Sequence, residues 1–126
     1  MAQVRALIVD DSEAMRRSIG LALQRIPGLV CLEAQDGAEG LKRLSGEQFD
    51  VILTDINMPV MDGLKLIARA RQEGSLNRET PVLVITTESS QADRQRALAL
   101  GANGYLVKPF RAAEVLTAVK ELLKLP

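Results

Sequence analysis

The sequence contains no histidine, and its only cysteine is Cys31. With no imidazole and a single thiol, the composition argues against a zinc site, which takes several nitrogen or sulfur ligands. One cysteine also excludes an internal disulfide and fits a reducing compartment. The chain also has no excess of charge of either sign, because 16 Lys and Arg residues balance 16 Asp and Glu residues. We therefore expect no bulk attraction to nucleic acid or to an anionic membrane.

Long apolar runs are also absent, and none approaches the roughly 20 residues that a membrane span needs. The N-terminus leads from Met1 almost directly into a strand-like segment, which is not the pattern of a signal peptide. What remains is an ordinary globular composition, with 126 residues of which 47% are hydrophobic and 25% are charged. We expect one soluble, cytoplasmic domain over residues 1–126, without a disulfide or a structural metal.

Five short apolar segments alternate with five helical patterns along the chain. Three of these segments are continuous apolar runs, which are typical of strands covered on both faces in a parallel sheet. The strict alternation predicts an α/β fold with a doubly wound sheet. The expected strands are residues 6–9, 29–34, 51–54, 82–86 and 104–107.

Start and stop signals mark the expected helices. Ser12 is the expected N-cap of the first helix, and Pro27–Gly28 is expected to end it. Asp36 and Glu39 predict a capping box for the second helix. The third is expected to end near Gly74, the fourth spans 92–100 before Gly101, and the fifth carries an apolar stripe from Val115 to Leu123. The fourth helix has the thinnest apolar face, so it is either an easily shifted element or a solvated surface helix.

Reactive polar side chains follow four of the expected strands. Because the carboxyl ends of parallel strands meet at the edge where open α/β sheets bind ligands, we expect these side chains to lie close together. One Asp after a strand is usually a helix cap, but three carboxylates, a hydroxyl and an ammonium at one edge exceed what capping explains. The residues are Asp10 and Asp11 after the first strand, Asp55 after the third, Thr86 at the end of the fourth, and Lys108 after the fifth.

Three clustered carboxylates need positive counter-charges, because unit charges 4 Å apart repel by about 4 kcal/mol at an effective dielectric of about 20. Lys108 supplies one positive charge and a hard divalent cation would supply the rest. Oxygen ligands with few carboxylates and room for water favour Mg²⁺. A carboxylate beside Mg²⁺ and an ammonium can attack phosphorus to form an aspartyl phosphate. Thr86 can then donate a hydrogen bond to a phosphoryl oxygen.

These residues fall into the motifs of a known family. The chain resembles the receiver domain of two-component response regulators, most closely the single-domain, chemotaxis-type (CheY-like) members. The resemblance implies a flavodoxin-like (βα)5 sandwich with a five-stranded parallel sheet in the order 2-1-3-4-5, an order for which chemotaxis regulators are a known example. The matching segments are residues 9–12, 54–59, 61–63, 86–88 and 104–110.

The resemblance implies a role for each site residue. Asp55 would accept the phosphoryl group from a histidine kinase. Asp11, Asp55 and the backbone carbonyl of Asn57 would bind Mg²⁺ directly, and Asp10 would hold a metal-bound water or bind the ion more loosely. Lys108 would pair with the phosphoryl oxygens. The protein would thus be a signalling phosphoacceptor that catalyses only its own phosphorylation and dephosphorylation, not an enzyme acting on other substrates.

The resemblance also implies a switch. The hydroxyl of Thr86 would move toward the phosphoryl group, and the ring of Tyr105 would swing inward. The surface of the fourth helix, fifth strand and fifth helix would then change its binding to a downstream protein target. Asn57 and Glu88 would orient the attacking water and set the lifetime of the phospho-form. A cis bond in Lys108–Pro109 would aim the lysine.

Other interpretations fit the sequence less well. A dehalogenase-type phosphatase needs a second Asp two residues after its nucleophile, where this chain has Asn57. A flavin-binding electron carrier needs a Ser-, Thr- or Gly-rich loop after the first strand, where Asp10 and Asp11 stand. A receiver module cut from a longer regulator and a phosphorylation-independent pseudo-receiver stay open. We expect a monomer with no direct nucleic-acid or membrane binding. Four basic residues are interpreted as solvated charge in preference to a docking surface, namely Arg16, Arg17, Lys120 and Lys124.

Overall fold

The computed structural model describes residues 3–125, in which five strands alternate with five helices. The ends of the expected 1–126 domain, residues 1, 2 and 126, lie outside the described residues. One parallel sheet runs in the order β2-β1-β3-β4-β5, which confirms the expected fold class and strand order. The strands are β1 (Val4–Val9), β2 (Leu29–Ala34), β3 (Val51–Thr54), β4 (Val82–Thr86) and β5 (Gly104–Val107).

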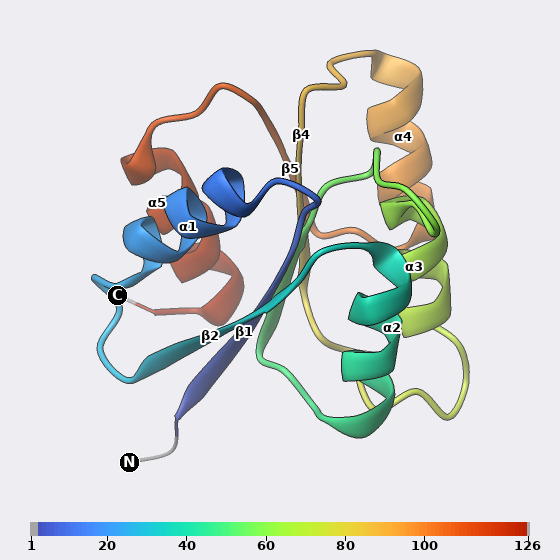
Figure 1. The fold of residues 1–126 in the computed structure, drawn as a ribbon, viewed down its shortest axis with the longest axis horizontal. Coiled ribbons are helices and arrows are strands. Elements are labelled where there is room, and N and C mark those ends of the chain that lie inside the picture. Colours follow the sequence, from blue (N-terminus) through green and yellow to red (C-terminus); the bar gives the residue numbers. More distant parts are fainter. Residues whose placement is uncertain (1–2, 126) are drawn as a thin grey trace.

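Helices cover both faces of the sheet (Figure 1). On one face α1 (Glu13–Leu23) packs beside α5 (Ala112–Leu123), and on the other α3 (Gly63–Ala70) lies between α2 (Gly37–Gly46) and α4 (Gln91–Leu100). Each face has its own hydrophobic cluster. None of the helices in residues 3–125 is long and apolar enough to cross a membrane.

The continuous apolar runs of the sequence are the strands that both layers cover. Every residue of β3 and of β4 is buried. Side chains alternate between the two clusters, so that Leu7 and Val9 of β1 face one layer while Ala6 and Ile8 face the other. Each large apolar side chain buried in this way stabilises the fold by about 1.5–3 kcal/mol.

The helix starts follow the sequence signals. The Ser12 hydroxyl accepts a hydrogen bond from the N–H of Met15 at the start of α1, and the Asp36 carboxylate accepts one from the N–H of Glu39 at the start of α2. At the end of α4, Gly101 adopts φ 117°, a left-handed conformation that glycine takes without strain. These caps fix where α1 and α2 begin and where α4 ends.

Two expected helix ends are wrong. The first helix ends at Leu23, not at Pro27–Gly28, and the N–H of Ile26 bonds to the Leu23 carbonyl in a turn. Ile26 is nevertheless only 3% exposed. The apolar pattern therefore identified a buried residue, although that residue lies in the turn after the helix. The third helix ends at Ala70, well before Gly74, because the chain turns there into the loop before β4.

The fourth helix is thinly packed, as expected. Ala97 is its only buried residue within the described part of the chain, and Leu98 is 42% exposed. Since packing supplies most helix stability in proteins, α4 is held less firmly than the other helices. Whether it shifts on phosphorylation stays a prediction.

Candidate functional site

The three carboxylates predicted from the sequence lie together at the carboxyl edge of the sheet. Asp10 and Asp11 follow β1, Asp55 follows β3, and these neighbouring strands pair in parallel with Val9 opposite Thr54. Ligand oxygens of the three Asp residues lie within 4.8 Å of one another. Asp10 and Asp55 are buried, whereas Asp11 is exposed. The expected cluster is therefore present.

Lys108 reaches this cluster from the end of β5. Its amine lies 2.8 Å from Oδ2 of Asp10 and 2.9 Å from Oδ2 of Asp55, and its side chain is 11% exposed. Burial alone lowers the pKa of Lys108, but hydrogen bonds to Asp10 and Asp55 and their negative charges outweigh it, so the pKa is raised. The lysine is thus a fixed cation. Its bond to Pro109 is cis, as expected.

The Asp55 carboxylate is held from two sides. Oδ1 accepts hydrogen bonds from the backbone N–H groups of Ile56 at 2.6 Å and Asn57 at 3.1 Å, while Oδ2 receives Lys108. The start of α3 packs directly against the loop that carries Asp55. A Cβ atom added at Gly63 would lie 1.9 Å from the Asp55 carbonyl oxygen. Only glycine therefore allows α3 to begin so close to the site.

The donor set fits a hard divalent cation. Three carboxylates and one ammonium sum to a net charge of −3 + 1 = −2, which a dication balances. All the side-chain donors are oxygens, the ligands that Mg²⁺ takes in proteins. Asp11 is open to solvent, which leaves room for the waters that Mg²⁺ retains.

The other four predicted residues meet at Glu88. The buried Thr86 hydroxyl accepts a hydrogen bond from the Glu88 N–H at 3.2 Å, and the Tyr105 hydroxyl donates to the Glu88 carbonyl at 2.7 Å. The Asn57 amide donates to the Glu88 carboxylate at 2.5 Å. The sequence indicated two separate pairs, Thr86 with Tyr105 and Asn57 with Glu88. The structure joins them through one residue.

Comparisons with known proteins agree with this geometry. The family model of the response regulator receiver domain matches residues 6–120 of this chain. The chain belongs to this family. The expected resemblance is confirmed, and receiver domains are in general phosphoacceptors that take phosphoryl groups from histidine kinases, bind Mg²⁺ and act on downstream targets.

Individual relatives of this receiver domain include both long and short regulators. It is 40% identical over 120 residues to the transcriptional regulatory protein PrrA of Mycobacterium tuberculosis, a match that covers 95% of this chain and 50% of PrrA. It is 41% identical over 108 residues to the chemotaxis protein CheY1 of Helicobacter pylori, covering 85% and 86%. The chain thus spans about half the length of the PrrA relatives it matches.

Solved structures of CheY proteins share the fold of this receiver domain. The chemotaxis protein CheY4 of Vibrio cholerae superposes with a TM-score of 0.87 at 37% identity, covering 96% of this chain and 99% of that one. A CheY-like receiver domain from Methanospirillum hungatei gives a TM-score of 0.89 at 30% identity. The flavodoxin-like arrangement expected from the sequence is therefore confirmed.

Sequence reasoning missed one residue that touches the predicted switch of this receiver domain. The guanidinium of Arg94, on α4, lies 5.8 Å from the centre of the Tyr105 ring. Burial, followed by the charges of Asp93, Glu88 and Asp55, raises the pKa of Tyr105, so its hydroxyl stays protonated and donates. No spacing in the sequence marks Arg94, because its contact with the ring depends on how α4 lies against β5.

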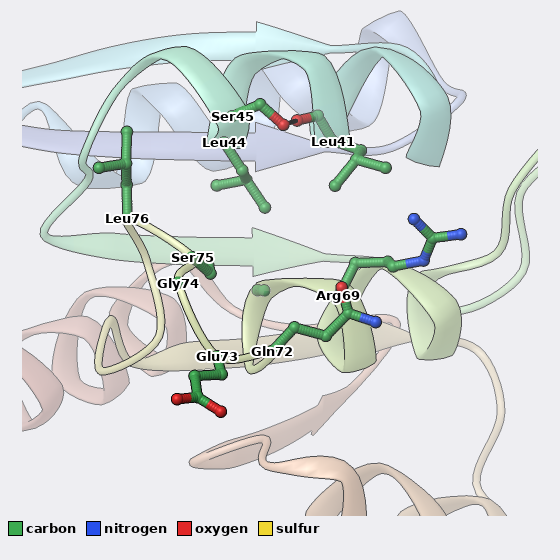
Figure 2. A pocket seen from close by; sticks show the side chains of 10 residues that line it. Leu41, Leu44, Ser45, Arg69, Gln72, Glu73, Gly74, Ser75 and Leu76 are labelled. Carbon is green, nitrogen blue, oxygen red and sulfur yellow. Dashed lines mark hydrogen bonds between the residues drawn. The ribbon is translucent and has the colours of Figure 1, made fainter.

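A hollow elsewhere in the receiver domain contains none of the predicted site residues. It has a volume of about 330 Å³ and lies between α2, α3 and the loop before β4, where Leu41, Leu44 and Arg69 line it (Figure 2). Leu76, in that loop, is 52% exposed beside it. The carboxylate cluster at the carboxyl edge is therefore the candidate site for chemistry.

Proposed function

We propose that this receiver domain is a phosphorylation-dependent signalling switch in which Asp55 accepts a phosphoryl group from a histidine kinase. The observation that carries the proposal is the cluster of Asp10, Asp11 and Asp55, with oxygens within 4.8 Å of one another, in which the Lys108 amine contacts Asp10 and Asp55. Such crowding of negative charge is tolerable only beside bound cations, and it makes one carboxylate ready to accept phosphorus.

Phosphoryl transfer needs little from the protein beyond position and charge. An oxygen of Asp55 forms a bond to phosphorus as the bond from phosphorus to the kinase histidine breaks. The imidazole nitrogen keeps the electron pair and takes up a proton from solvent. Asp10, Asp11, Asp55 and the Asn57 carbonyl would hold Mg²⁺, which supplies positive charge for the transferring oxygens. The Lys108 ammonium leaves Asp55 and pairs with a phosphoryl oxygen.

The switch follows from the hydrogen bonds at Glu88. When the Thr86 hydroxyl turns to a phosphoryl oxygen, it gives up its bond from the Glu88 N–H. The loop that carries the Glu88 carbonyl is then released, and with it the anchor of the Tyr105 hydroxyl. Movement of the ring also changes its contact with Arg94 on α4. Because α4 is thinly packed, the α4-β5-α5 surface responds, and a downstream protein target binds it differently.

The phospho-form then decays by hydrolysis. The backbone N–H of Asn57 donates to the Asp55 carboxylate, and the Asn57 side chain is hydrogen-bonded to that of Glu88. Both are polar and able to orient an attacking water. They therefore set the lifetime of the signal.

The test is phosphorylation by acetyl phosphate in the presence of Mg²⁺, followed by intact-mass measurement. The wild type should gain one phosphoryl group, and Asp55→Asn should gain none. Asp50→Asn is the matched control, because Asp50 is an exposed Asp that immediately precedes β3 as Asp55 immediately follows it. Labelling of Asp55→Asn at the wild-type rate contradicts the assignment of Asp55 as the phosphoacceptor. No labelling of the wild type contradicts the proposal and leaves the pseudo-receiver alternative.

The match to PrrA favours a second setting for the same switch. Since the chain spans about half of PrrA, the α4-β5-α5 surface here is suited to act on a segment joined to the receiver as well as on a separate protein. Phosphorylation at Asp55 is common to both settings. Comparing the hydrodynamic size of the natural full-length protein with and without acetyl phosphate separates a partner within the chain from one outside it.

A further inference from the structure

Two neighbouring arginines of α1 have different surroundings. Arg17 is solvated, as expected from the sequence, with a side chain 73% exposed and an ion pair to Glu13 at 3.4 Å. Arg16 is not solvated, because its side chain is only 14% exposed. The sequence-based interpretation of Arg16 is therefore wrong, and its largely covered side chain needs another explanation.

Arg16 ties three elements together. Its Nε donates to the carboxylate of Glu33, on β2, at 2.8 Å. One terminal nitrogen donates to the backbone carbonyl of Asp10 at 2.6 Å. That carbonyl belongs to the peptide group that joins Asp10 to Asp11, so a charged side chain of α1 fixes the peptide between two predicted Mg²⁺ ligands.

The orientation of this peptide decides where Asp11 points. Asp10 is anchored independently, by its N–H to the Ala34 carbonyl at 3.1 Å, by the Ser12 N–H to its Oδ1 and by Lys108 to its Oδ2. Asp11 is exposed, so its placement depends on the backbone that carries it. Without the guanidinium, the Asp10 carbonyl loses its charged partner and the Asp10–Asp11 peptide is held only through the residues on either side of it, so it can tilt and move the Asp11 carboxylate relative to the cluster.

We propose that Arg16 is a positioning residue that holds the Asp10–Asp11 peptide so that Asp11 is preoriented for Mg²⁺. This inference rests on the proposed function, since it concerns the metal ligands of that site. Outer groups that orient metal ligands typically change metal affinity by about 10–100-fold when they are removed. Glu33 neutralises Arg16, so the guanidinium adds little net positive charge beside a cation site.

Loss of the charge of Arg16 and loss of its positioning role would change the affinity for Mg²⁺ in opposite directions. Arg16→Gln removes a positive charge near the cluster and leaves Glu33 unpaired, and both changes attract Mg²⁺ more strongly. Loss of positioning weakens Mg²⁺ binding instead. Arg17→Gln is the matched control, because it removes the same charge from the adjacent position without touching Asp10.

The experiment is calorimetric titration of Mg²⁺ into the metal-free protein, with melting curves in chelator to confirm folding. We expect Arg16→Gln to raise the Mg²⁺ dissociation constant about tenfold, and Arg17→Gln to leave it within about twofold, as surface charges act weakly. Arg16→Lys keeps the charge and should recover only part of the affinity, because a single ammonium does not span the two acceptors as the planar guanidinium does.

The double variant Arg16→Gln/Glu33→Gln removes the unpaired carboxylate and carries the test if the single variant fails to fold. Mg²⁺ binding by either variant as tight as that of Arg17→Gln overturns the positioning role. Asp11→Asn identifies the source of a failure. If the wild type binds no Mg²⁺, or if Asp11→Asn binds it equally well, the proposed function fails and the inference with it. If Asp11→Asn loses Mg²⁺ and Arg16→Gln does not, only the inference fails.

Discussion

Removing one carboxylate from the cluster should stabilise the protein when no divalent cation is present. At the 4.8 Å that bounds the separations of the Asp oxygens, two unit charges repel by about 3.5 kcal/mol at a dielectric of about 20, and by about 0.9 kcal/mol in bulk water. Asp11 is exposed, so its two repulsions lie near the lower value. Asp11→Asn should therefore raise the free energy of unfolding in chelator by about 2 kcal/mol.

Asp10→Asn should behave differently, because Asp10 is paired. Its Oδ2 lies 2.8 Å from the Lys108 amine, where the attraction is about 6 kcal/mol at a dielectric of about 20. The repulsion from the buried Asp55, about 3.5 kcal/mol, and that from the exposed Asp11, about 0.9 kcal/mol, together offset only part of this attraction. Asp10→Asn should thus lower the free energy of unfolding by about 1–2 kcal/mol, and a gain in stability is expected only for the exposed residue of the pair.

The assay is thermal melting in chelator and again in saturating Mg²⁺. For a chain of 126 residues, a gain of about 2 kcal/mol raises the melting temperature by roughly 8 °C. Glu73→Gln, the same charge change at an exposed loop residue, should shift it by no more than about 2 °C. A Mg²⁺ concentration about 100 times the dissociation constant adds about 2.7 kcal/mol to the wild type. The order of wild type and Asp11→Asn should therefore reverse.

Two results would refute this reasoning. A melting temperature for Asp11→Asn below that of the wild type in chelator means that the carboxylate is not repelled where it stands. Equal stabilisation of wild type and variant by Mg²⁺ means that Asp11 is not a ligand. A third outcome, equal gains for Asp10→Asn and Asp11→Asn, contradicts only the balance of charges assigned to Lys108.

Three further predictions concern the switch and its loop. Apolar residues at both Asn57 and Glu88 should slow phosphate release from the phospho-form about 10- to 100-fold, because the attacking water loses its orientation; equal release rates contradict this. In Thr86→Ala, addition of beryllofluoride should no longer shift the NMR signals of the only tyrosine ring, and a shift of wild-type size excludes the switch role. Gly63→Ala should lower the free energy of unfolding by at least about 1–3 kcal/mol, since its Cβ meets a backbone oxygen, whereas Gly46→Ala meets nothing and should be tolerated.

The sheet and the carboxylate cluster were predictable because they depend on short-range patterns and on topology. Apolar runs such as Val51–Thr54 are long enough to identify a strand buried on both faces, and alternation with helices makes the sheet parallel. In a parallel sheet, every residue that directly follows a strand lies at the same edge. Asp10, Asp55 and Lys108 could therefore be brought together before any coordinates were known.

Features that depend on where a helix ends and how it is oriented on the sheet could not be predicted. Ile26 continues a helical apolar pattern, yet the helix ends three residues earlier and Ile26 is buried from a turn. Arg16 and Arg17 are identical in type and adjacent in sequence, and only the orientation of α1 makes one of them meet the Asp10 carbonyl. A sequence pattern shows which side chains are apolar, but it does not show which backbone carbonyl an arginine side chain will bind.

The hydrogen bonds at Glu88 separate the residues of the proposed switch from those proposed to set the lifetime of the phospho-form. Thr86 and Tyr105 bind the backbone N–H and carbonyl of Glu88, which every residue except proline provides at this position. Asn57 binds the side-chain carboxylate of Glu88, which changes with the residue at this position. If Asn57 and Glu88 set the lifetime of the phospho-form as proposed, substitution at position 88 would change that lifetime while the link between hydroxyl and ring stays intact. Such a receiver would change how long its signal lasts without changing how the signal is transmitted.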